Sequence, residues 1–282
     1  MTIGEIYHLG KSRLAQAGNE SPAFDAACLM KLIFELDRQR LLLRSGEPAG
    51  DEKKEEYFQK IEERASGRPL QYIVGKWPFL DLELAVGEGV LIPREETELL
   101  VHTAAELLKK HPSPRIIDLC SGTGAVALGL ASLLPDSKIT AAELYEQACA
   151  FLARNCEETG YGNVAFLRLD ILDPKSAERF SGLDGIVSNP PYVKEDELAG
   201  LQIEVKREPQ TALAGGADGL DFYRAIARLW IPRLKPGGIA AVEIGEGQAE
   251  DVRVLFEQAG LSEIKIYRDF NGIERVVAGI RK

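Results

Sequence analysis

The sequence predicts an α/β protein: a doubly wound, mostly parallel sheet of seven strands, preceded by a small all-helical domain and a β-hairpin connector. Two observations predict this fold. From Pro114 onward, short apolar runs alternate with segments of helical periodicity, whereas the chain before residue 70 contains only helical patterns. Alternating strands and helices build a parallel sheet that helices cover on both faces. We therefore expect three parts, over residues 1–69, 70–92 and 93–282.

The first part reads as three helices. Helices are expected over Thr2–Ala17, Ala23–Leu36 and Asp51–Ser66. Ser21 is placed to cap the second helix, with Pro22 in its first turn, because Ser is a favoured N-cap and Pro suits the first helical position. The charged run at the start of the third helix is interpreted as a solvated helix face.

The connector has a different texture. Gly75, Pro78 and Gly87 divide residues 70–92 into short apolar runs. Apolar residues occupy alternate positions from Leu80 to Val86. Period-two alternation between glycine and proline breaks predicts a β-hairpin.

The third part alternates regularly. Strands and helices are expected, in order, at Arg115–Cys120, Ala125–Leu134, Lys138–Glu143, Glu146–Thr159, Val164–Leu169, Leu183–Ser188, Phe222–Leu234, Gly238–Ile244 and Gln248–Ala259, followed by two closing strands.

Composition excludes several classes of protein. Of 282 residues, 45% are hydrophobic and 28% charged, which is enough apolar side chain for a sizeable core. The net charge of −10 repels polyanions, so no direct nucleic-acid binding is expected. The cysteines lack metal-ligand spacing, and the sequence contains no membrane span or export signal. We expect a reduced, metal-free cytoplasmic protein that does not associate with membranes.

A glycine loop follows the first strand of the third part. Residues 116–124 join a buried strand to a helix through Ser121-Gly122-Thr123-Gly124. Small residues allow the backbone to approach a ligand, and the helix N-terminus then points at it. A nucleotide-like ligand is implied, although Gly122, Gly124 and Ala127 also fit a looser dinucleotide fingerprint, and a ligand-free turn has the same spacing.

Two acids near this loop refine the prediction. Glu143 ends the next strand, about 20 residues after the loop, where a carboxylate can bind ribose hydroxyls. Asp118, at the end of the strand before the loop, would be unfavourable beside a pyrophosphate but favourable beside an ammonium group. Alternatively, Asp118 caps the amides of its own loop.

The segment from Asp118 to Gly124 resembles the first motif of class I S-adenosylmethionine-dependent methyltransferases, which have a Rossmann-like fold, and Glu143 resembles the acid of the second. The sequence departs from the pattern at Cys120, where many members have glycine. The resemblance implies S-adenosyl-L-methionine as cofactor, with an apolar contact to adenine from Ile171. The cofactor-binding residues that it implies are Asp118, Cys120, Ser121, Gly122, Thr123, Gly124, Glu143, Asp170, Ile171 and Asn189.

The quartet Asn189-Pro190-Pro191-Tyr192 follows a short apolar strand. A residue before proline is held extended, so the carbonyls of Asn189 and Pro190 have fixed directions. The Asn189 side-chain oxygen and the Pro190 carbonyl can each accept one N–H of an NH2 group. Tyr192 would stack on a planar target. Catalysis would come mainly from alignment, through Asn189, Pro190 and Tyr192. Alternatively, the double proline only ends a strand.

Nearly the whole chain resembles the release factor glutamine N5-methyltransferases. The motifs that carry this resemblance, beyond the cofactor loop and the quartet, are Arg68-Pro69-Leu70-Gln71-Tyr72-Ile73-Val74-Gly75, Leu91-Ile92-Pro93-Arg94 with Glu96-Thr97-Glu98, Glu208-Pro209, and Asp218 to Arg224. At Glu95 the family often has proline. The resemblance implies that residues Asn189, Pro190, Pro191 and Tyr192 bind the target glutamine in the Gly-Gly-Gln loop of a class I peptide chain release factor, and that the helical part docks this substrate.

Other interpretations stay open. Arg94, Glu96 and Glu98 either face the substrate or form surface ion pairs. An adenine-N6 DNA or RNA methyltransferase shares the quartet, but we find no basic groove or recognition domain. A nicotinamide oxidoreductase would explain the glycine loop and leave Asn189 without a role. A non-catalytic cofactor-binding scaffold would keep its biological role after Asn189→Ala.

Overall fold

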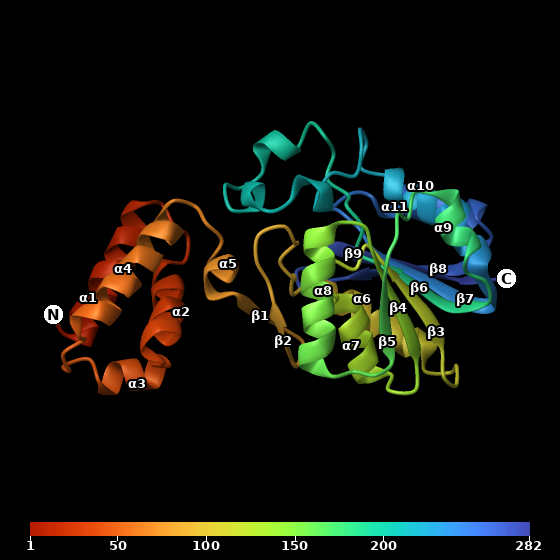
Figure 1. Cartoon of the computed structure of the whole chain (residues 1–282). Helices are drawn as coiled ribbons and strands as arrows, with labels where there is room; N and C mark the ends of the chain where they lie inside the picture. Colours follow the sequence, from red (N-terminus) through yellow and green to blue (C-terminus); the bar gives the residue numbers. More distant parts are fainter. The chain divides into compact units, whose positions relative to one another are not determined.

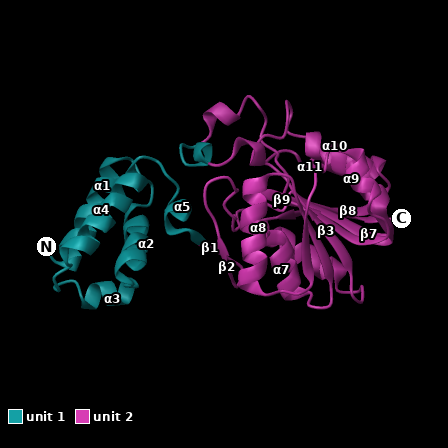
Figure 2. Ribbon diagram, viewed as in Figure 1, with its two compact units in different colours: residues 1–76, 202–207 teal, residues 77–201, 208–282 magenta.

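The computed structural model describes all 282 residues, which form two compact units (Figure 2). Unit 1 contains residues 1–76 and 202–207, and unit 2 contains residues 77–201 and 208–282. None of the helices combines the length and the apolar character needed to cross a membrane.

Unit 1 is helical. Its helices are α1 (Ile3–Gln16), α2 (Pro22–Phe34), α3 (Arg38–Leu43), α4 (Asp51–Ala65) and α5 (Leu70–Val74). Helices α1, α2 and α4 enclose a core in which the ring of Tyr57 is fully buried. The ring packs on Gly10, where an added Cβ would lie 2.4 Å from the Tyr57 hydroxyl oxygen. Gly10 is therefore a packing requirement inside a helix.

The start of α2 differs in one detail from the sequence prediction. Ser21 is the N-cap residue and Pro22 is the first helical residue, but the Ser21 side chain makes no capping hydrogen bond. Its backbone (φ −128°, ψ 53°) lies outside the extended region that aims an N-cap side chain at the helix amides. The Ser21 amide instead donates to Asn19 Oδ1 at 2.8 Å.

The segment before the hairpin also differs from the prediction. Residues Leu70–Val74 form the short helix α5, where we expected extended chain. The aromatic and β-branched residues Tyr72, Ile73 and Val74 favour strands locally, but Leu70, Tyr72 and Ile73 bury their side chains on one short turn of helix. Gly75 then ends the helix in the left-handed conformation (φ 79°). Helix α3 was also not predicted.

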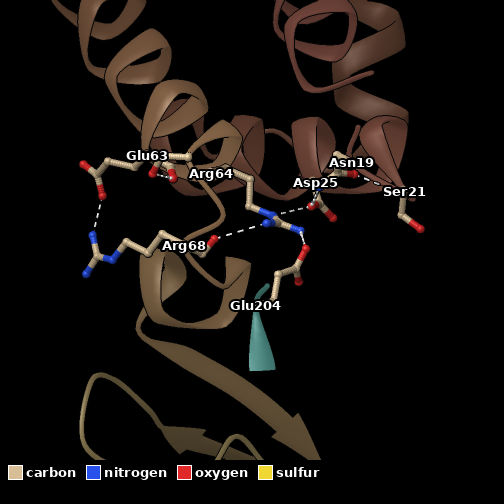
Figure 3. Close-up of polar contacts among 8 residues, drawn as sticks. Asn19, Ser21, Asp25, Glu63, Arg64, Arg68 and Glu204 are labelled. Atoms are coloured by element: carbon tan, nitrogen blue, oxygen red, sulfur yellow. Dashed lines mark hydrogen bonds and ion pairs between the residues drawn. The ribbon is translucent and has the colours of Figure 1, made fainter. Parts of the chain in front are cut away.

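A buried ion cluster holds unit 1 together around Arg64 (Figure 3). The Arg64 side chain is only 6% exposed, and its Nε donates to Asp25 Oδ2 at 2.6 Å. A second nitrogen of the same guanidinium pairs with Glu204 of segment 202–207, and a third donates to the Arg68 carbonyl at 3.2 Å. Asn19 Nδ2 completes the shell of Asp25 at 2.7 Å. One cation thus ties α2, α4 and segment 202–207 together.

Arg64→Met is expected to destabilise unit 1 by about 3–5 kcal/mol, because it leaves the buried Asp25 carboxylate without its cation. Hydrogen exchange of the α1, α2 and α4 amides, measured on the full chain by mass spectrometry, reports this loss directly. The matched control is Arg44→Met, which removes an exposed pair with Glu47 in the same unit and should leave exchange nearly unchanged. Equal effects of the two substitutions would show that the Arg64 cluster contributes no more than a surface pair.

Unit 2 is built on a seven-stranded sheet (Figure 1). A separate hairpin, β1 (Lys76–Phe79) and β2 (Leu82–Ala85), comes before it, and begins later than the predicted hairpin. The sheet order is β5-β4-β3-β6-β7-β9-β8, with β9 antiparallel to β7 and β8 and all other pairs parallel. Its strands are β3 (Arg115–Leu119), β4 (Lys138–Glu143), β5 (Val164–Arg168), β6 (Leu183–Ser188), β7 (Leu234–Glu243), β8 (Leu261–Arg268) and β9 (Glu274–Arg281). This is the predicted fold class.

Helices cover both faces of the sheet (Figure 1). One face carries α6 (Thr97–Leu108), α7 (Ala125–Leu133) and α8 (Glu146–Thr159), and the other carries α9 (Pro174–Glu178), α10 (Asp221–Ala225) and α11 (Ala249–Gln258). Neighbouring strand residues serve opposite cores: Ile116 belongs to the first and Ile117 to the second. This explains why the strands read as continuous apolar runs.

Two helices of unit 2 differ from the sequence prediction. Helix α6 was not predicted, although it is largely buried against the sheet. The single helix expected over Phe222–Leu234 is α10 followed by a π-helical turn (Ile226–Trp230) and a 3₁₀ turn (Ile231–Arg233). Pro232 cannot donate to an α-helical ladder, which accounts for the change of hydrogen-bond pattern near the end.

Strand order fixes where a ligand can bind. Along the chain, β3, β4 and β5 extend the sheet in one direction, while β6 and β7 extend it in the other. The order therefore reverses between β3 and β6. Ligands of open α/β sheets bind at the carboxyl ends of the strands at such a switch point. In the register of this sheet, Leu119 of β3 pairs with Ser188 of β6, which brings the residues following both strands to the same edge.

Candidate functional site

A cavity of about 300 Å³ opens at this edge of unit 2, at the lower end of the range for small-molecule sites. Residues following β3, β4, β5 and β6 line it, together with parts of residues 89–97 and 209–222. Of the residues predicted from sequence, those that line the cavity are Cys120, Ser121, Gly122, Thr123, Glu143, Asp170, Ile171, Asn189 and Pro191. The other predicted site residues, Asp118, Gly124, Pro190 and Tyr192, are not among the residues that line it.

The glycine loop turns sharply between β3 and α7. Cys120 has a φ of 60°, a left-handed conformation that glycine adopts without strain, and Gly124 has a φ of 85°. A Cβ at Gly124 would lie 2.5 Å from Leu152 Cδ1, so this glycine is required by the packing of α7 on α8. Burial raises the pKa of the Cys120 thiol, and the nearby carboxylates of Glu143 and Asp118 raise it further. Cys120 thus presents a neutral thiol to the cavity.

Glu143 fastens the loop to the next strand. Its Oε2 accepts the Gly122 amide at 2.9 Å, and its Oε1 accepts the amides of Leu144 and Tyr145 at 2.7 and 2.9 Å. A carboxylate has about four lone-pair positions, so three backbone bonds leave one direction for a further donor. Glu143 therefore shapes the cavity wall and retains capacity to bind a hydroxyl group.

Asp118 is completely buried behind the loop. Neither carboxylate oxygen has a well-formed hydrogen bond. Burial raises the pKa of Asp118 to about 7, because the nearby Ser121 hydroxyl and Ala127 amide offset only part of the desolvation and Glu143 adds repulsion. A buried acid without a partner is the feature that a cationic ligand group nearby would satisfy.

Asp170 and Ile171 form the wall beyond β5. Asp170 Oδ1 accepts the Leu172 amide at 2.8 Å, which fixes the turn after the strand. The Ile171 carbonyl accepts the indole N–H of Trp230 at 2.9 Å, so its side chain is held as a buried apolar surface of the cavity. The pair offers one polar and one apolar face.

The segment Asn189–Tyr192 follows β6 beside the glycine loop. Asn189 Nδ2 donates to Thr97 Oγ1 of α6 at 3.1 Å, while the side chain also lines the cavity. Pro190 and Pro191 are buried, which makes the turn rigid. The Tyr192 hydroxyl donates to Glu243 Oε1 at 3.5 Å. Burial raises the pKa of Tyr192 well above its ordinary value, with further repulsion from Glu243, so the ring is neutral.

Comparison with known proteins shows which family the chain belongs to. Residues 5–75 match the family described as PrmC N-terminal domain, and residues 95–208 match the methyltransferase small domain. The release factor glutamine methyltransferase of Geobacter sulfurreducens is 37% identical over 99% of this chain and 96% of its own length. The chain belongs to the release factor glutamine methyltransferase family. The corresponding protein of Moorella thermoacetica is 35% identical over 100% of this chain and 99% of its own.

Solved structures agree on the fold. The match with the ribosomal protein L11 methylase of Lactobacillus delbrueckii covers 73% of this chain and 90% of the methylase chain. It has a TM-score of 0.52 at 14% sequence identity. Such a likeness shows the class I methyltransferase fold alone. Together with the full-length relatives, it confirms the predicted fold class and the resemblance stated from sequence, and the chain is a methyltransferase.

Sequence analysis assigned no role to the residues that support the quartet, which are Gln248, Glu243 and Thr97, although Thr97 belongs to one of the motifs that carry the family resemblance. Gln248 Nε2 donates to the Tyr192 carbonyl at 3.1 Å and to the Gly219 carbonyl at 3.3 Å, while its Oε1 accepts the Gly245 amide at 2.9 Å. Thr97 accepts a hydrogen bond from the Asn189 side chain, and Glu243 accepts one from the Tyr192 hydroxyl. The available signal was weak: Glu243, like Asp118 and Glu143, is an acid at the end of an apolar strand.

Two charged residues near the start of α6, Arg94 and Glu98, have structural partners. Arg94 lines the cavity and pairs with the buried carboxylate of Glu208, whose other oxygen accepts the Ile92 amide at 2.9 Å. Glu98 Oε1 accepts the Leu80 amide at 2.7 Å. Glu98 therefore has a role within the fold, and Arg94 is oriented at the cavity by a buried acid.

Proposed function

We propose that this chain transfers a methyl group from S-adenosyl-L-methionine to the side-chain amide nitrogen N5 of the glutamine in the Gly-Gly-Gln loop of class I peptide chain release factors. One observation carries the proposal: Asn189 lines the same cavity as the glycine loop and Glu143, at the switch point of the sheet. The names of the full-length relatives support the same substrate.

The residues of the cavity fit this cofactor. Glu143 retains one acceptor direction for a ribose hydroxyl, Asp170 and Ile171 offer a polar and an apolar face for adenine, and the unpartnered carboxylate of Asp118 favours a cationic group nearby. When bound, the cofactor supplies an electrophilic methyl group on a sulfonium. Cys120 to Thr123 would contact its methionyl part, and the helix N-terminus of α7 follows directly.

The quartet supplies alignment to a poor nucleophile. The nitrogen lone pair of an amide is delocalised, so the protein must hold the NH2 in line with the methyl group, and such positioning contributes up to about 7–11 kcal/mol. The Asn189 side-chain oxygen and the Pro190 carbonyl each accept one N–H. The buried prolines keep these acceptors in place. The proton leaves after the transfer has acidified the nitrogen, so no general base is needed.

The substrate is tested by offering labelled S-adenosyl-L-methionine with three acceptors in parallel: a class I release factor, its Gln→Ala variant in the Gly-Gly-Gln loop, and duplex DNA. Label is expected in the first alone. The net charge of −10 also predicts that transfer to a basic partner slows with added salt, since complementary charge accelerates encounter. Label in DNA would establish the adenine alternative, and cofactor binding without any transfer would establish the scaffold.

A further inference from the structure

A single buried side chain of α8 connects two segments that lead into the walls of the cavity. Asn155 is only 1% exposed. Its Nδ2 donates to the Thr123 carbonyl of the glycine loop at 2.9 Å and to the Ala85 carbonyl at 3.1 Å. Its Oδ1 accepts the Ala85 amide at 2.7 Å. One amide group therefore joins the glycine loop after β3 to the last residue of β2.

Both connected segments contribute to the cavity. The glycine loop lines it directly. Ala85 is followed by residues 86–91, here called the irregular wall because they form neither helix nor strand, and the second half of this wall lines the cavity. Without a ladder of regular hydrogen bonds, the position of the irregular wall depends on how its two ends are held. Asn155 bonds the residue before it, and Glu208 accepts the Ile92 amide just after it at 2.9 Å.

Two glycines bring the irregular wall close to α8. A Cβ at Gly87 would lie 2.7 Å from Phe151 Cζ, and a Cβ at Gly89 would collide with the Gln147 side chain. Gln147, Phe151 and Asn155 follow one another at intervals of four residues, so they lie on one face of α8. This face of α8 therefore contacts the irregular wall and bonds the residue that precedes it.

The backbone around Asn155 fixes how its amide is turned. The Ala85 amide requires an acceptor, and the carbonyls of Ala85 and Thr123 require donors, so the oxygen and the NH2 each have one possible place. Aspartate has the same shape but would set a second oxygen against the two carbonyls. Because a buried polar group that loses its partner costs free energy, the three bonds favour one spacing between the glycine loop and the end of β2.

We propose that Asn155 is a positioning residue for the cofactor: by bonding the glycine loop and the end of β2 with one amide, it keeps two walls of the cavity at the spacing that S-adenosyl-L-methionine requires before the cofactor binds. The inference rests on the proposed function, in which this cofactor occupies the cavity. Asn155 does not line the cavity, so it acts through the two walls and makes no contact with the ligand.

Asn155→Ala is expected to weaken binding of S-adenosyl-L-homocysteine, the unreactive demethylated form of the cofactor, by about tenfold or more. The variant loses three hydrogen bonds, and an apparent dissociation constant rises in proportion as the binding-competent state becomes less populated. Isothermal titration measures this affinity. Methyl transfer at saturating cofactor should stay within about threefold of the wild type, because the bound cofactor itself then holds the walls. Amides of residues 84–92 and 120–126 should exchange faster in the variant and recover when the ligand is added.

Leu261→Ala is the control for a general loss of stability. Leu261 is buried at the start of β8, an edge strand of the sheet. The substitution leaves a cavity in the core of unit 2 and should destabilise the fold without touching either wall. Its affinity for S-adenosyl-L-homocysteine should equal that of the wild type.

Gly87→Ala disturbs the irregular wall independently of Asn155. Its new Cβ should push the wall away from Phe151 and weaken binding, and adding Phe151→Leu, which removes the tip of the ring, should restore the affinity. If the wild type does not bind S-adenosyl-L-homocysteine, the proposed function fails and the inference fails with it. If the wild type binds, the inference alone is overturned when Asn155→Ala binds as tightly, or when Leu261→Ala loses as much affinity as Asn155→Ala.

Discussion

Asn189→Ala is expected to slow methyl transfer to a release factor by about 100-fold or more, with little change in cofactor affinity. Removing the side chain takes away one of the two acceptors that hold the target NH2, and loss of one oriented group in an active site costs on the order of 10²–10³ in rate. The fold should tolerate the change, because Asn189 lies half-buried in a loop and bonds only to Thr97. A radiolabel assay and isothermal titration measure the two effects separately.

Two controls sharpen this expectation. Asn163→Ala removes an asparagine that bonds Ser137 and the Leu134 carbonyl, and it should transfer methyl groups at the wild-type rate. Glu143→Ala should mainly weaken cofactor binding, because Glu143 holds the glycine loop through the Gly122 amide. Equal losses of rate and affinity in both Asn189→Ala and Glu143→Ala would contradict the separate roles assigned to the two residues.

The fold was predictable where local pattern and burial agree. Strands β3, β4 and β6 lie within about a residue of their expected positions, because each is an apolar run bounded by polar turn residues. Leu70–Val74 was misinterpreted because its β-formers are used in one turn of helix, so tertiary burial outweighed local preference. Strand order and register cannot be read from such patterns, because they arise from contacts between distant segments.

The residues of the site likewise divide into those that could be predicted from local sequence and those that depend on contacts between distant segments. Residues on one continuous motif, such as Cys120 to Thr123 and Asn189 with Pro191, could be found from sequence and do line the cavity. The contacts of Thr97 and Glu243 with the quartet could not be predicted, because they join residues that are 92 and 51 positions apart in the sequence. Only the packing of α6 on the sheet and the pairing of β6 with β7 bring them there. The sequence shows that Thr97 and Glu243 are polar, but it does not show that they contact Asn189 and Tyr192.

Asp118→Asn is expected to stabilise the protein without cofactor at pH 8 and to weaken cofactor binding. The pKa of Asp118 is raised by burial to about 7 from an ordinary value of 3.8, so the folded state prefers the protonated acid. A group whose pKa is raised in the folded state contributes fully below its unfolded pKa, and this contribution is lost as pH rises through the folded value. The loss falls between about pH 4 and pH 7 and amounts to as much as about 4 kcal/mol. Asparagine is uncharged at every pH, so the Asp118→Asn variant does not lose stability as the pH rises.

Asp184→Asn is the matched control for Asp118→Asn, since Asp184 is also buried but has partners. Burial raises its pKa, but Lys235, the Arg115 amide and His111 outweigh burial, so the pKa is lowered. Its contribution to stability is present above its unfolded pKa and is lost as pH falls. Asp184→Asn should therefore destabilise the protein at pH 8, where Asp118→Asn stabilises it. Urea denaturation at pH 5 and pH 8, followed by the fluorescence of the unit 2 residues Trp77 and Trp230, separates the two signs.

Cofactor affinity then decides between the two roles open to Asp118. If its carboxylate faces the cationic end of the methionine moiety, Asp118→Asn should weaken binding by about tenfold or more at pH 8, since a charge-assisted contact is worth about 1.5–3 kcal/mol. If the carboxylate only caps the amides of its own loop, asparagine can replace it and affinity should stay at the wild-type value. A variant that is more stable without cofactor and binds it as well as the wild type would remove Asp118 from the cofactor site. A gain in stability with a loss of affinity would mean that the energetic cost of burying this acid serves ligand binding.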